Sequence, residues 1–259
     1  MTQPRADLYV DRARADSFGA AARIYDARRP RYPDQLIDDL LSRGVQRVLD
    51  VGAGTGIASE QLLGKGVDVL AVEPDPRMAE IAKQKGIPTE IGTFENWDPA
   101  ERSFDLVVFA QSFHWVNPAI ALPKAHVLLS RGGNLALMWN RLFPTDPTHG
   151  DFAEIYRDYM DPGSPLVDGS SNGLVETDGN TDRLIASITA SGFTVEERTY
   201  PRCAHYSAEQ WLDLVFTYSN HLILAAEKAS ELRARLAERI GSQGVSVGGD
   251  TLLILATRS

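Results

Sequence analysis

Apolar runs of strand length alternate with amphipathic stretches of helical spacing through the first half of the chain. The stretches with helical spacing lie at 56–66, 75–86 and 119–133. Strands that alternate with helices predict right-handed βαβ units, so we expect a parallel sheet with helices on both faces. The expected strands are RVLDV (47–51), VDVLAVE (67–73), PTEIGT (88–93), SFDLVVFAQ (103–111) and NLALMWN (134–140).

The pattern changes at residue 144. Residues 144–182 are rich in Gly, Ser, Pro and Asp and contain one short helical piece, so they cannot bury much apolar surface. We expect a mobile lid at 161–182, because this stretch follows the fifth strand directly. Further elements are expected as a helix at 183–193, a strand at 194–201, a capping box SAEQ at 207–210 that opens a long helical region, and a buried strand at 250–258.

Composition narrows the classes of protein to consider. A length of 259 residues suits one large α/β domain, and no window approaches 18 uninterrupted apolar residues, so we expect no membrane partner. The single cysteine, Cys203, excludes an internal disulfide and, with an N-terminus that lacks a secretory signal, favours a cytoplasmic location. The net charge of −9 argues against a nucleic-acid partner. The five histidines show no spacing typical of a metal site.

A glycine-rich turn follows the first expected strand. Gly52, Gly54 and Gly56 come directly after it, and Asp50 lies two residues before the first glycine. Such a turn, between a first strand and a first helix, is where α/β sheets bind nucleotide-like ligands. The dinucleotide fingerprint G-x-G-x-x-G/A fails at its third position, which is Ile57. Because a carboxylate suits a cationic ammonium group better than a diphosphate, S-adenosylmethionine is the favoured cofactor, with a dinucleotide-dependent oxidoreductase as the alternative.

Four motifs together resemble a known family. VLDVGAGTG, AVEPDPRM, GTFENW and FDLVVFAQSFHWVNP resemble successive motifs of class I S-adenosylmethionine-dependent methyltransferases. SFGAAARIYDARRPRYP (17–33) and FHWV resemble the subgroup of trans-aconitate methyltransferases, which is methyltransferase type 11-like. The resemblance covers roughly 17–142 and implies a Rossmann-like α/β fold with a seven-stranded, mostly parallel sheet. It also implies four parts: an N-terminal helical cap at 1–46, a cofactor-binding core at 47–143, a substrate lid with the sixth strand and C-terminal helices at 144–249, and a closing strand at 250–259.

The resemblance also implies the cofactor contacts. Asp50 and the backbone of Gly52 and Gly54 would surround the methionine amino group. Glu73 would accept both ribose hydroxyls, because one carboxylate has two acceptor oxygens. Tyr25 and Arg29 of the cap, with Arg28 and Arg31 as alternatives to Arg29, would hold the methionine carboxylate. The remaining contacts are Pro74, Asp75 and Met78 beside the adenine, Thr93 and Glu95 near its amino group, Phe94 against the ring, and Ala110 and Gln111 beneath the methionine chain.

The expected chemistry asks little of the protein. Methyl transfer is an in-line displacement that depends on alignment in a dry pocket, and an acceptor that is already ionised, such as a carboxylate, needs no base. His114 could act as a base for a phenol or an amine, or shape the pocket, while Trp115 would wall the site. Asn140 and Arg141 could orient a polar acceptor. We therefore expect a methyltransferase, monomeric or homodimeric, that acts on a small molecule, with carboxylate O-methylation as a candidate reaction and a non-catalytic cofactor-binding protein as a further alternative.

Overall fold

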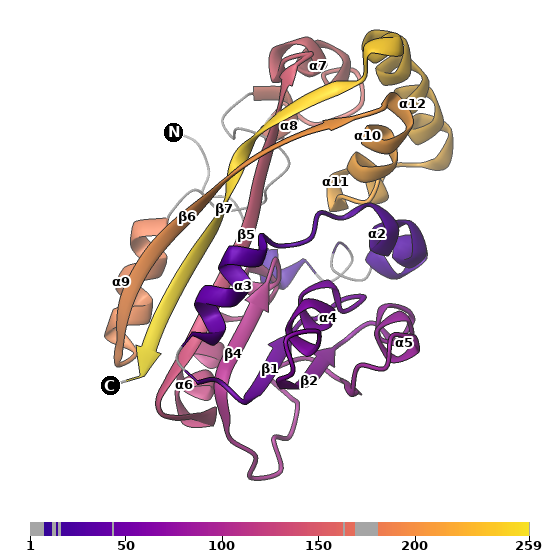
Figure 1. Cartoon of the computed structure of the whole chain (residues 1–259). Helices are drawn as coiled ribbons and strands as arrows, with labels where there is room; N and C mark the ends of the chain where they lie inside the picture. Colours follow the sequence, from indigo (N-terminus) through magenta and orange to yellow (C-terminus); the bar gives the residue numbers. More distant parts are fainter. Residues whose placement is uncertain are drawn as a thin grey trace.

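A seven-stranded sheet forms the centre of the molecule, in the order β3-β2-β1-β4-β5-β7-β6 (Figure 1). The computed structural model describes residues 8–11, 14, 17–42, 44–162, 164–168 and 181–258. β1 pairs in parallel with β2 and β4, β2 with β3, and β4 with β5, whereas β7 is antiparallel to both β5 and β6. The predicted seven-stranded, mostly parallel sheet is confirmed. The strands are β1 Arg47–Val51, β2 Asp68–Glu73, β3 Thr89–Ile91, β4 Phe104–Ala110, β5 Leu129–Asp146, β6 Phe193–Tyr206 and β7 Val245–Arg258.

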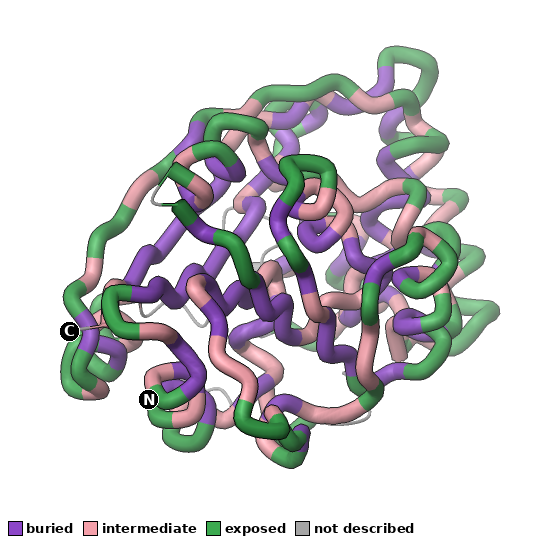
Figure 2. The backbone as a smooth tube through the Cα atoms, turned by 60° about the horizontal axis from the view of Figure 1, so that its bottom comes forward, coloured by how far each residue is buried: buried purple, intermediate pink, exposed green. Residues whose placement is uncertain are grey.

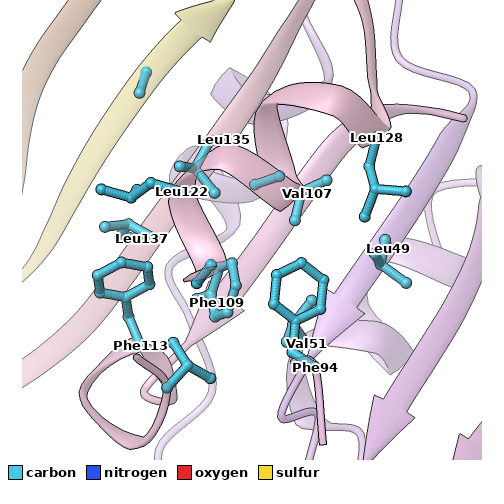
Figure 3. Close-up of a cluster of buried hydrophobic side chains, with 14 of the residues drawn as sticks. Leu49, Val51, Phe94, Val107, Phe109, Phe113, Leu122, Leu128, Leu135 and Leu137 are labelled. Carbon is cyan, nitrogen blue, oxygen red and sulfur yellow. The ribbon is translucent and has the colours of Figure 1, made fainter. Parts of the chain in front are cut away.

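Helices cover both faces of the sheet, as predicted. Apolar residues of α3 and α4 pack on one face with Val48 and Leu106, and α5 packs beside them on Ala71. α6 and α9 cover the other face, where Phe94, Phe109 and Phe113 join the core (Figure 3). Figure 2 shows buried backbone in the centre and exposed residues along the periphery. The helices are α2 Ala22–Arg28, α3 Asp34–Leu41, α4 Ile57–Leu63, α5 Pro76–Gln84, α6 Pro118–Leu128, α7 His149–Tyr156, α8 Pro165–Asp168, α9 Thr181–Ala190, α10 Ala208–Val215, α11 Ser219–Leu222 and α12 Ala226–Ile240, with short 3-10 turns at Leu8–Val10, Phe18–Ala21, Phe113–Trp115 and Gly241–Gln243.

Three strands differ in length from the sequence prediction. The helix expected to reach residue 133 ends at Leu128, and β5 then runs from Leu129 to Asp146, so the expected fifth strand at 134–140 was too short. β6 continues to Tyr206, and β7 starts at Val245 rather than at residue 250. The cause is pairing, because the backbone groups of these segments are satisfied by the β5–β7 and β6–β7 ladders whatever their strand propensity. The helix predicted at 56–66 also ends early, at Leu63.

The far ends of β5, β6 and β7 carry a second group of helices. α7, α8, α10, α11 and α12 gather beyond the carboxyl ends of the parallel strands (Figure 1). They share a core with β5 and β7, in which Trp211, Leu236 and Val245 are buried. We call this group the C-terminal lobe. The predicted capping box opens α10, with Ser207 and Gln210 in reciprocal hydrogen bonds. The expected lid at 161–182 lies largely outside the described residues, which omit 163 and 169–180.

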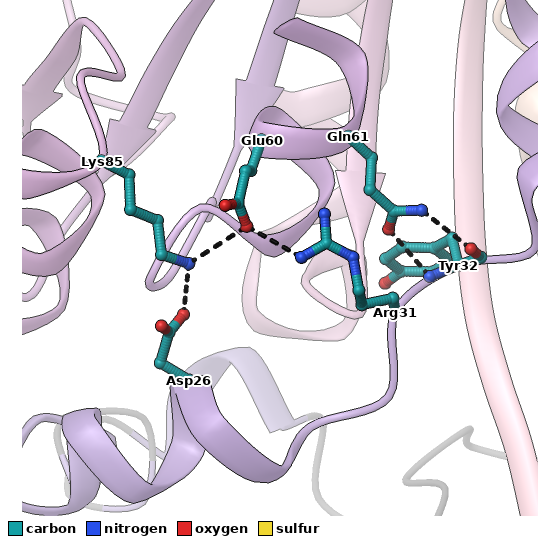
Figure 4. Close-up of polar contacts among 6 residues, drawn as sticks. All are labelled: Asp26, Arg31, Tyr32, Glu60, Gln61 and Lys85. Atoms are coloured by element: carbon teal, nitrogen blue, oxygen red, sulfur yellow. Dashed lines mark hydrogen bonds and ion pairs between the residues drawn. The ribbon is translucent and has the colours of Figure 1, made fainter. Parts of the chain in front are cut away.

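The N-terminal helix α2 is fixed to α4 and α5 by a polar network. Lys85, the residue after α5, pairs with Asp26 of α2 and lies 3.6 Å from Glu60 of α4. The Gln61 side chain exchanges hydrogen bonds of 2.9 and 2.8 Å with the backbone N–H and carbonyl of Tyr32. These contacts place α2 over the glycine turn. The network comprises Asp26, Arg31, Tyr32, Glu60, Gln61 and Lys85 (Figure 4).

Candidate cofactor-binding site

A cavity lies at the carboxyl ends of β1, β2 and β4 and beside Asn140 of β5, between α2 and the corner that joins α10 to α11. Its volume is about 1320 Å³ when its open mouth is included. Asp50, Arg141 and the two alternatives to Arg29, Arg28 and Arg31, do not line it. All of the other predicted site residues do, namely Tyr25, Arg29, Gly52, Gly54, Glu73, Pro74, Asp75, Met78, Thr93, Phe94, Glu95, Ala110, Gln111, His114, Trp115 and Asn140.

The three glycines of the turn serve two different purposes. Gly52, Gly54 and Gly56 have φ angles of +63°, +60° and +80°, a region that favours glycine. A Cβ on Gly52 would lie 2.6 Å from the Cβ of Ser112, and one on Gly56 would lie 2.4 Å from Ile87 Cδ1, so these two allow close packing inside the protein. A Cβ on Gly54 would find no atom closer than 3.5 Å. Because Gly54 lines the cavity, its missing side chain leaves the cavity floor open.

Asp50 lies behind the turn rather than on the cavity wall. Its side chain is fully buried, and Ser59 Oγ donates a 2.6 Å hydrogen bond to its Oδ2. Its Oδ1 has no hydrogen-bond partner among the described residues. Burial raises the pKa of Asp50 to about 6. The expected contact between Asp50 and a methionine amino group stays a prediction.

Glu73 is held between the turn and the start of α5. Its Oε2 accepts the backbone N–H of Gly54 at 2.8 Å, and its Oε1 accepts that of Asp75 at 3.0 Å. Each oxygen of a carboxylate has about two acceptor sites, so each keeps one for a ligand hydroxyl. Burial raises the pKa of Glu73 to about 7, with the charges of Asp75 and Asp50 adding to the shift. Asp75 itself caps α5 and pairs with Arg77 at 2.7 Å, which lowers its pKa.

The turn after β3 forms the cavity wall on the same side, and a lysine fixes it from behind. Phe94 and Glu95 line the cavity, and Glu95 Oε1 accepts the backbone N–H of Asn117 at 2.9 Å. Lys124 of α6 donates to the carbonyl of Phe94 at 2.6 Å and also to that of Trp97. Burial lowers the pKa of Lys124. The sequence analysis missed Lys124, whose only signal is a charge within the apolar stretch 118–128.

The opposite end of the cavity is aromatic and carries a neutral histidine. Phe18, which the sequence analysis missed, packs edge-on against Tyr25 and Trp115 at ring distances of 6.0 and 5.8 Å. Enclosure by the protein and the nearby Arg29 charge lower the pKa of His114 to about 3. His114 is therefore uncharged near neutral pH and is a weak base.

Arg29 is a cation that lines the cavity without an ion-pair partner in the described part of the chain. Its Nε donates to Thr217 Oγ1 at 3.0 Å, and its Nη2 donates to the Thr217 carbonyl at 2.9 Å. Its guanidinium lies 4.6 Å from the ring centre of Tyr25 and 3.8 Å from that of Tyr218. Nothing in the sequence indicated that residues near 217 would reach the cavity; Tyr218 and Ser219 also line it.

Asn140 lines the cavity, but its amide is engaged within the protein. Its Oδ1 accepts hydrogen bonds from Thr251 at 2.7 Å and Arg202 at 3.2 Å, and its Nδ2 donates to the Pro30 carbonyl at 3.2 Å. This network ties the segment after α2 to β5, β6 and β7. Arg141, the other residue expected to orient an acceptor, is not on the cavity wall; it forms a two-pronged pair with Asp250 at 2.7 and 2.8 Å.

Two features are absent from the part of the chain that the structure describes. No group of three or more His, Cys, Asp or Glu side chains there is placed to hold a metal ion. None of the helices there is long and apolar enough to span a membrane.

Comparison with known proteins finds matches to the part of the chain that includes the glycine turn. Residues 49–137 match the family described as "Methyltransferase domain". An uncharacterised methyltransferase of Mycobacterium tuberculosis is 42% identical over 143 residues, which span 54% of this chain and 56% of that protein. The chain thus spans about half the length of this curated relative.

Solved structures show a similar fold. The YcgJ protein of Bacillus subtilis has a TM-score of 0.53 at 17% identity, over 86% of this chain and 96% of that one. Phosphoethanolamine N-methyltransferase 2 of Haemonchus contortus, solved with S-adenosylhomocysteine, has a TM-score of 0.50 at 12% identity, over all of this chain and 60% of that one. The family match begins in β1 and ends in β5, so it contains the glycine turn, Glu73 and the wall after β3. Residues 49–137 are therefore a class I methyltransferase domain, an enzyme domain whose cofactor is S-adenosylmethionine.

Proposed function

We propose that the whole chain is a methyltransferase that transfers the methyl group of S-adenosylmethionine to a small-molecule acceptor. The observation that carries this is the separation of charge along the cavity. Glu73 and Glu95 lie on the β2–β3 side, whereas Arg29 and the uncharged His114 lie on the other side. The adenosine of the cofactor would lie on the β2–β3 side, with its ribose hydroxyls on Glu73. The methionine portion would cross the glycine turn and end with its carboxylate on Arg29.

The cavity suits the physical requirements of methyl transfer. The reaction is an in-line displacement at a sulfonium carbon, and alignment of the acceptor in a water-poor pocket can lower its barrier by several kcal/mol. In this arrangement Trp115 and Gln111 would border the space that the acceptor enters. Asn140 would act indirectly, because its hydrogen bonds fix the segment that follows α2.

The acceptor we propose is a small carboxylic acid, methylated on oxygen. Three carboxylates among the described residues line the cavity, those of Glu73, Asp75 and Glu95, and each already accepts a backbone N–H. They would therefore attract an ammonium acceptor less than unengaged carboxylates would. His114, with a pKa of about 3, would be a poor base for a phenol. A carboxylate is ionised at neutral pH and needs no base, and the sulfonium charge would attract it. The resemblance to the trans-aconitate methyltransferase subgroup supports the same proposal.

Two measurements test this proposal. S-adenosylhomocysteine should raise the melting temperature of the protein, whereas NADH should not; the reverse result would favour a dinucleotide-dependent oxidoreductase. A screen of small carboxylic acids, phenols and amines with methyl-labelled cofactor should give a labelled product with a carboxylic acid. The label should then leave as methanol on alkaline hydrolysis, as a methyl ester requires. Labelling confined to amines would overturn the carboxylate assignment, and cofactor binding without turnover on any acceptor would favour a non-catalytic protein.

A further inference from the structure

Thr217, a residue of the C-terminal lobe, makes the two hydrogen bonds that hold Arg29. It lies between α10 and α11, is fully buried, and does not line the cavity. Its hydroxyl donates to the Leu214 carbonyl at 2.6 Å, which turns an oxygen lone pair toward Arg29 Nε. Its carbonyl accepts from Arg29 Nη2. The direction of the guanidinium is therefore set by a residue 188 positions away in the sequence.

The rings on either side complete the support of Arg29. Tyr25 and Tyr218 both have their ring centres within 4.6 Å of the guanidinium carbon, so they restrict rotation of the planar group. Arg29 Nη1 makes no hydrogen bond to any described residue. Thr217 uses the N–H of Nε and one N–H of Nη2, so Nη1 is the nitrogen with both of its N–H groups left for an anion in the cavity.

Resting on the function proposed above, we propose that Thr217 is a positioning residue for the cofactor: it holds the Arg29 guanidinium so that Nη1 binds the methionine carboxylate. The methionine end of the cofactor site is then built jointly by α2 and the C-terminal lobe. The adenosine end does not depend on Thr217, because Glu73 and the turn after β3 are supported by the core of the sheet.

A second link between α2 and the C-terminal lobe allows the support of Arg29 by Thr217 to be tested apart from the packing of α2 against the lobe. Arg28, the neighbour of Arg29, pairs with Asp213 of α10 at 3.0 Å, and Arg233 of α12 pairs with the same carboxylate at 2.6 Å. None of these three residues lines the cavity. Loss of the Arg28–Asp213 pair therefore weakens the docking of α2 and leaves the support of Arg29 in place.

The experiment compares two ligands on the full chain. S-adenosylhomocysteine carries the methionine-derived carboxylate, whereas 5′-methylthioadenosine has the same nucleoside and sulfur but no amino-acid portion. Thr217→Val keeps the shape of the side chain and removes the hydroxyl. We expect calorimetry to give about tenfold weaker binding of S-adenosylhomocysteine, the scale of one hydrogen bond to a charged group, and binding of 5′-methylthioadenosine within about twofold of the wild type.

Control variants distinguish positioning from structural damage. Thr217→Ser keeps the hydroxyl and should bind both ligands like the wild type, whereas Arg28→Met should leave the ratio of the two affinities unchanged. Should Thr217→Val not fold, Thr217→Ala removes the same hydroxyl without a buried extra methyl group. Equal weakening of both ligands by the Val or Ala variant, no weakening, or the same selective loss in Arg28→Met would each overturn the proposal. A wild-type protein that binds neither ligand would overturn the proposed function as well.

Discussion

At Gly54 the backbone has φ +60°, and an added Cβ would lie 3.5 Å from Met78 and 4.0 Å from Tyr25. The protein interior could therefore accept the extra carbon, and the only space it would enter is the cavity floor. Gly66, in the turn after α4, has a similar φ of +86°, and a Cβ added there would have no atom within 4 Å; it lies away from the cavity. A substitution at either glycine would therefore strain the backbone, but only a substitution at Gly54 would also take up space in the cavity.

We expect Gly54→Ala to abolish measurable binding of S-adenosylhomocysteine while the protein still folds. The left-handed conformation should cost about 1–2 kcal/mol of stability, and Gly66→Ala should show a similar loss with unchanged binding. Thermal denaturation and calorimetry on both variants check this. Normal binding by Gly54→Ala would mean that the cofactor does not cross the turn.

Glu73 gives a prediction about pH. Its pKa of about 7 in the ligand-free protein is above the ordinary value for a glutamate, so the folded state loses stability as the pH rises through 7 and the buried carboxyl ionises. Ribose hydroxyls that donate to Glu73 favour the ionised form, so cofactor binding should release a proton near this pH. The affinity for S-adenosylhomocysteine should rise about tenfold between pH 6 and pH 8, because only about a tenth of Glu73 is ionised at pH 6.

Calorimetry in buffers of different ionisation enthalpy measures the proton release directly. Glu73→Gln should bind more weakly, by roughly 2–3 kcal/mol at pH 8, and should lose most of this pH dependence. The pH dependence that remains in Glu73→Gln should reflect the ionisation of Asp50, whose pKa is about 6. An unchanged pH profile in Glu73→Gln would exclude Glu73 as the ribose ligand.

The sequence indicated which residues line the cavity better than it indicated which residues hold them in place through hydrogen bonds. Glu73 and the three glycines were predictable because a motif fixes them on one strand end and one turn. Thr217 was not, because its contact with Arg29 joins two segments that no local pattern relates. For the same reason the sequence did not indicate that Ser59 would donate a hydrogen bond to Asp50, whose expected contact with the ligand stays a prediction.

At the scale of elements, the parallel strands were predicted almost to the residue, and the long antiparallel ones were not. A parallel strand buried on both faces is a continuous apolar run, as in β4. β6 instead has residues exposed along most of its length, and Pro201 lies in its middle. As an edge strand paired only with β7, it tolerates the missing N–H of the proline, and its length is set by that ladder.

Lys124 of α6 gives a prediction at the same scale. Its ammonium group joins α6 to the turn after β3 through the carbonyls of Phe94 and Trp97, so Lys124→Met should leave both carbonyls without a partner. We expect a loss of about 1–3 kcal/mol in the free energy of unfolding and weaker binding of both S-adenosylhomocysteine and 5′-methylthioadenosine, because the adenosine wall loosens. Lys83→Met, an exposed lysine on α5, is the matched control and should change neither quantity. Unaltered unfolding and binding in Lys124→Met would show that the turn holds without it.

At the scale of the whole molecule, the cavity is lined by two structural parts, the parallel sheet on one side and α2 with the C-terminal lobe on the other. The parallel strands and the turns at their ends provide the floor, while α2 and the C-terminal lobe close over it (Figure 1). α2 contacts both the residue after α5, through Asp26 and Lys85, and α10, through Arg28 and Asp213. A ligand that bridges Glu73 and Arg29 would therefore hold the two parts of the molecule together from inside the cavity.

This bridging predicts where the cofactor changes hydrogen exchange. Saturation with S-adenosylhomocysteine at about 100 times its dissociation constant stabilises the bound state by about 2.7 kcal/mol, so openings that require ligand release should become up to about 100-fold rarer. We expect amides of α2 (Ala22–Arg28) and of the segment 208–222 to slow together, although they are distant in sequence. α9 (Thr181–Ala190), which packs on the opposite face of the sheet without lining the cavity, should exchange as before. Protection of α2 alone, with no change in 208–222, would mean that the lobe takes no part in binding the cofactor.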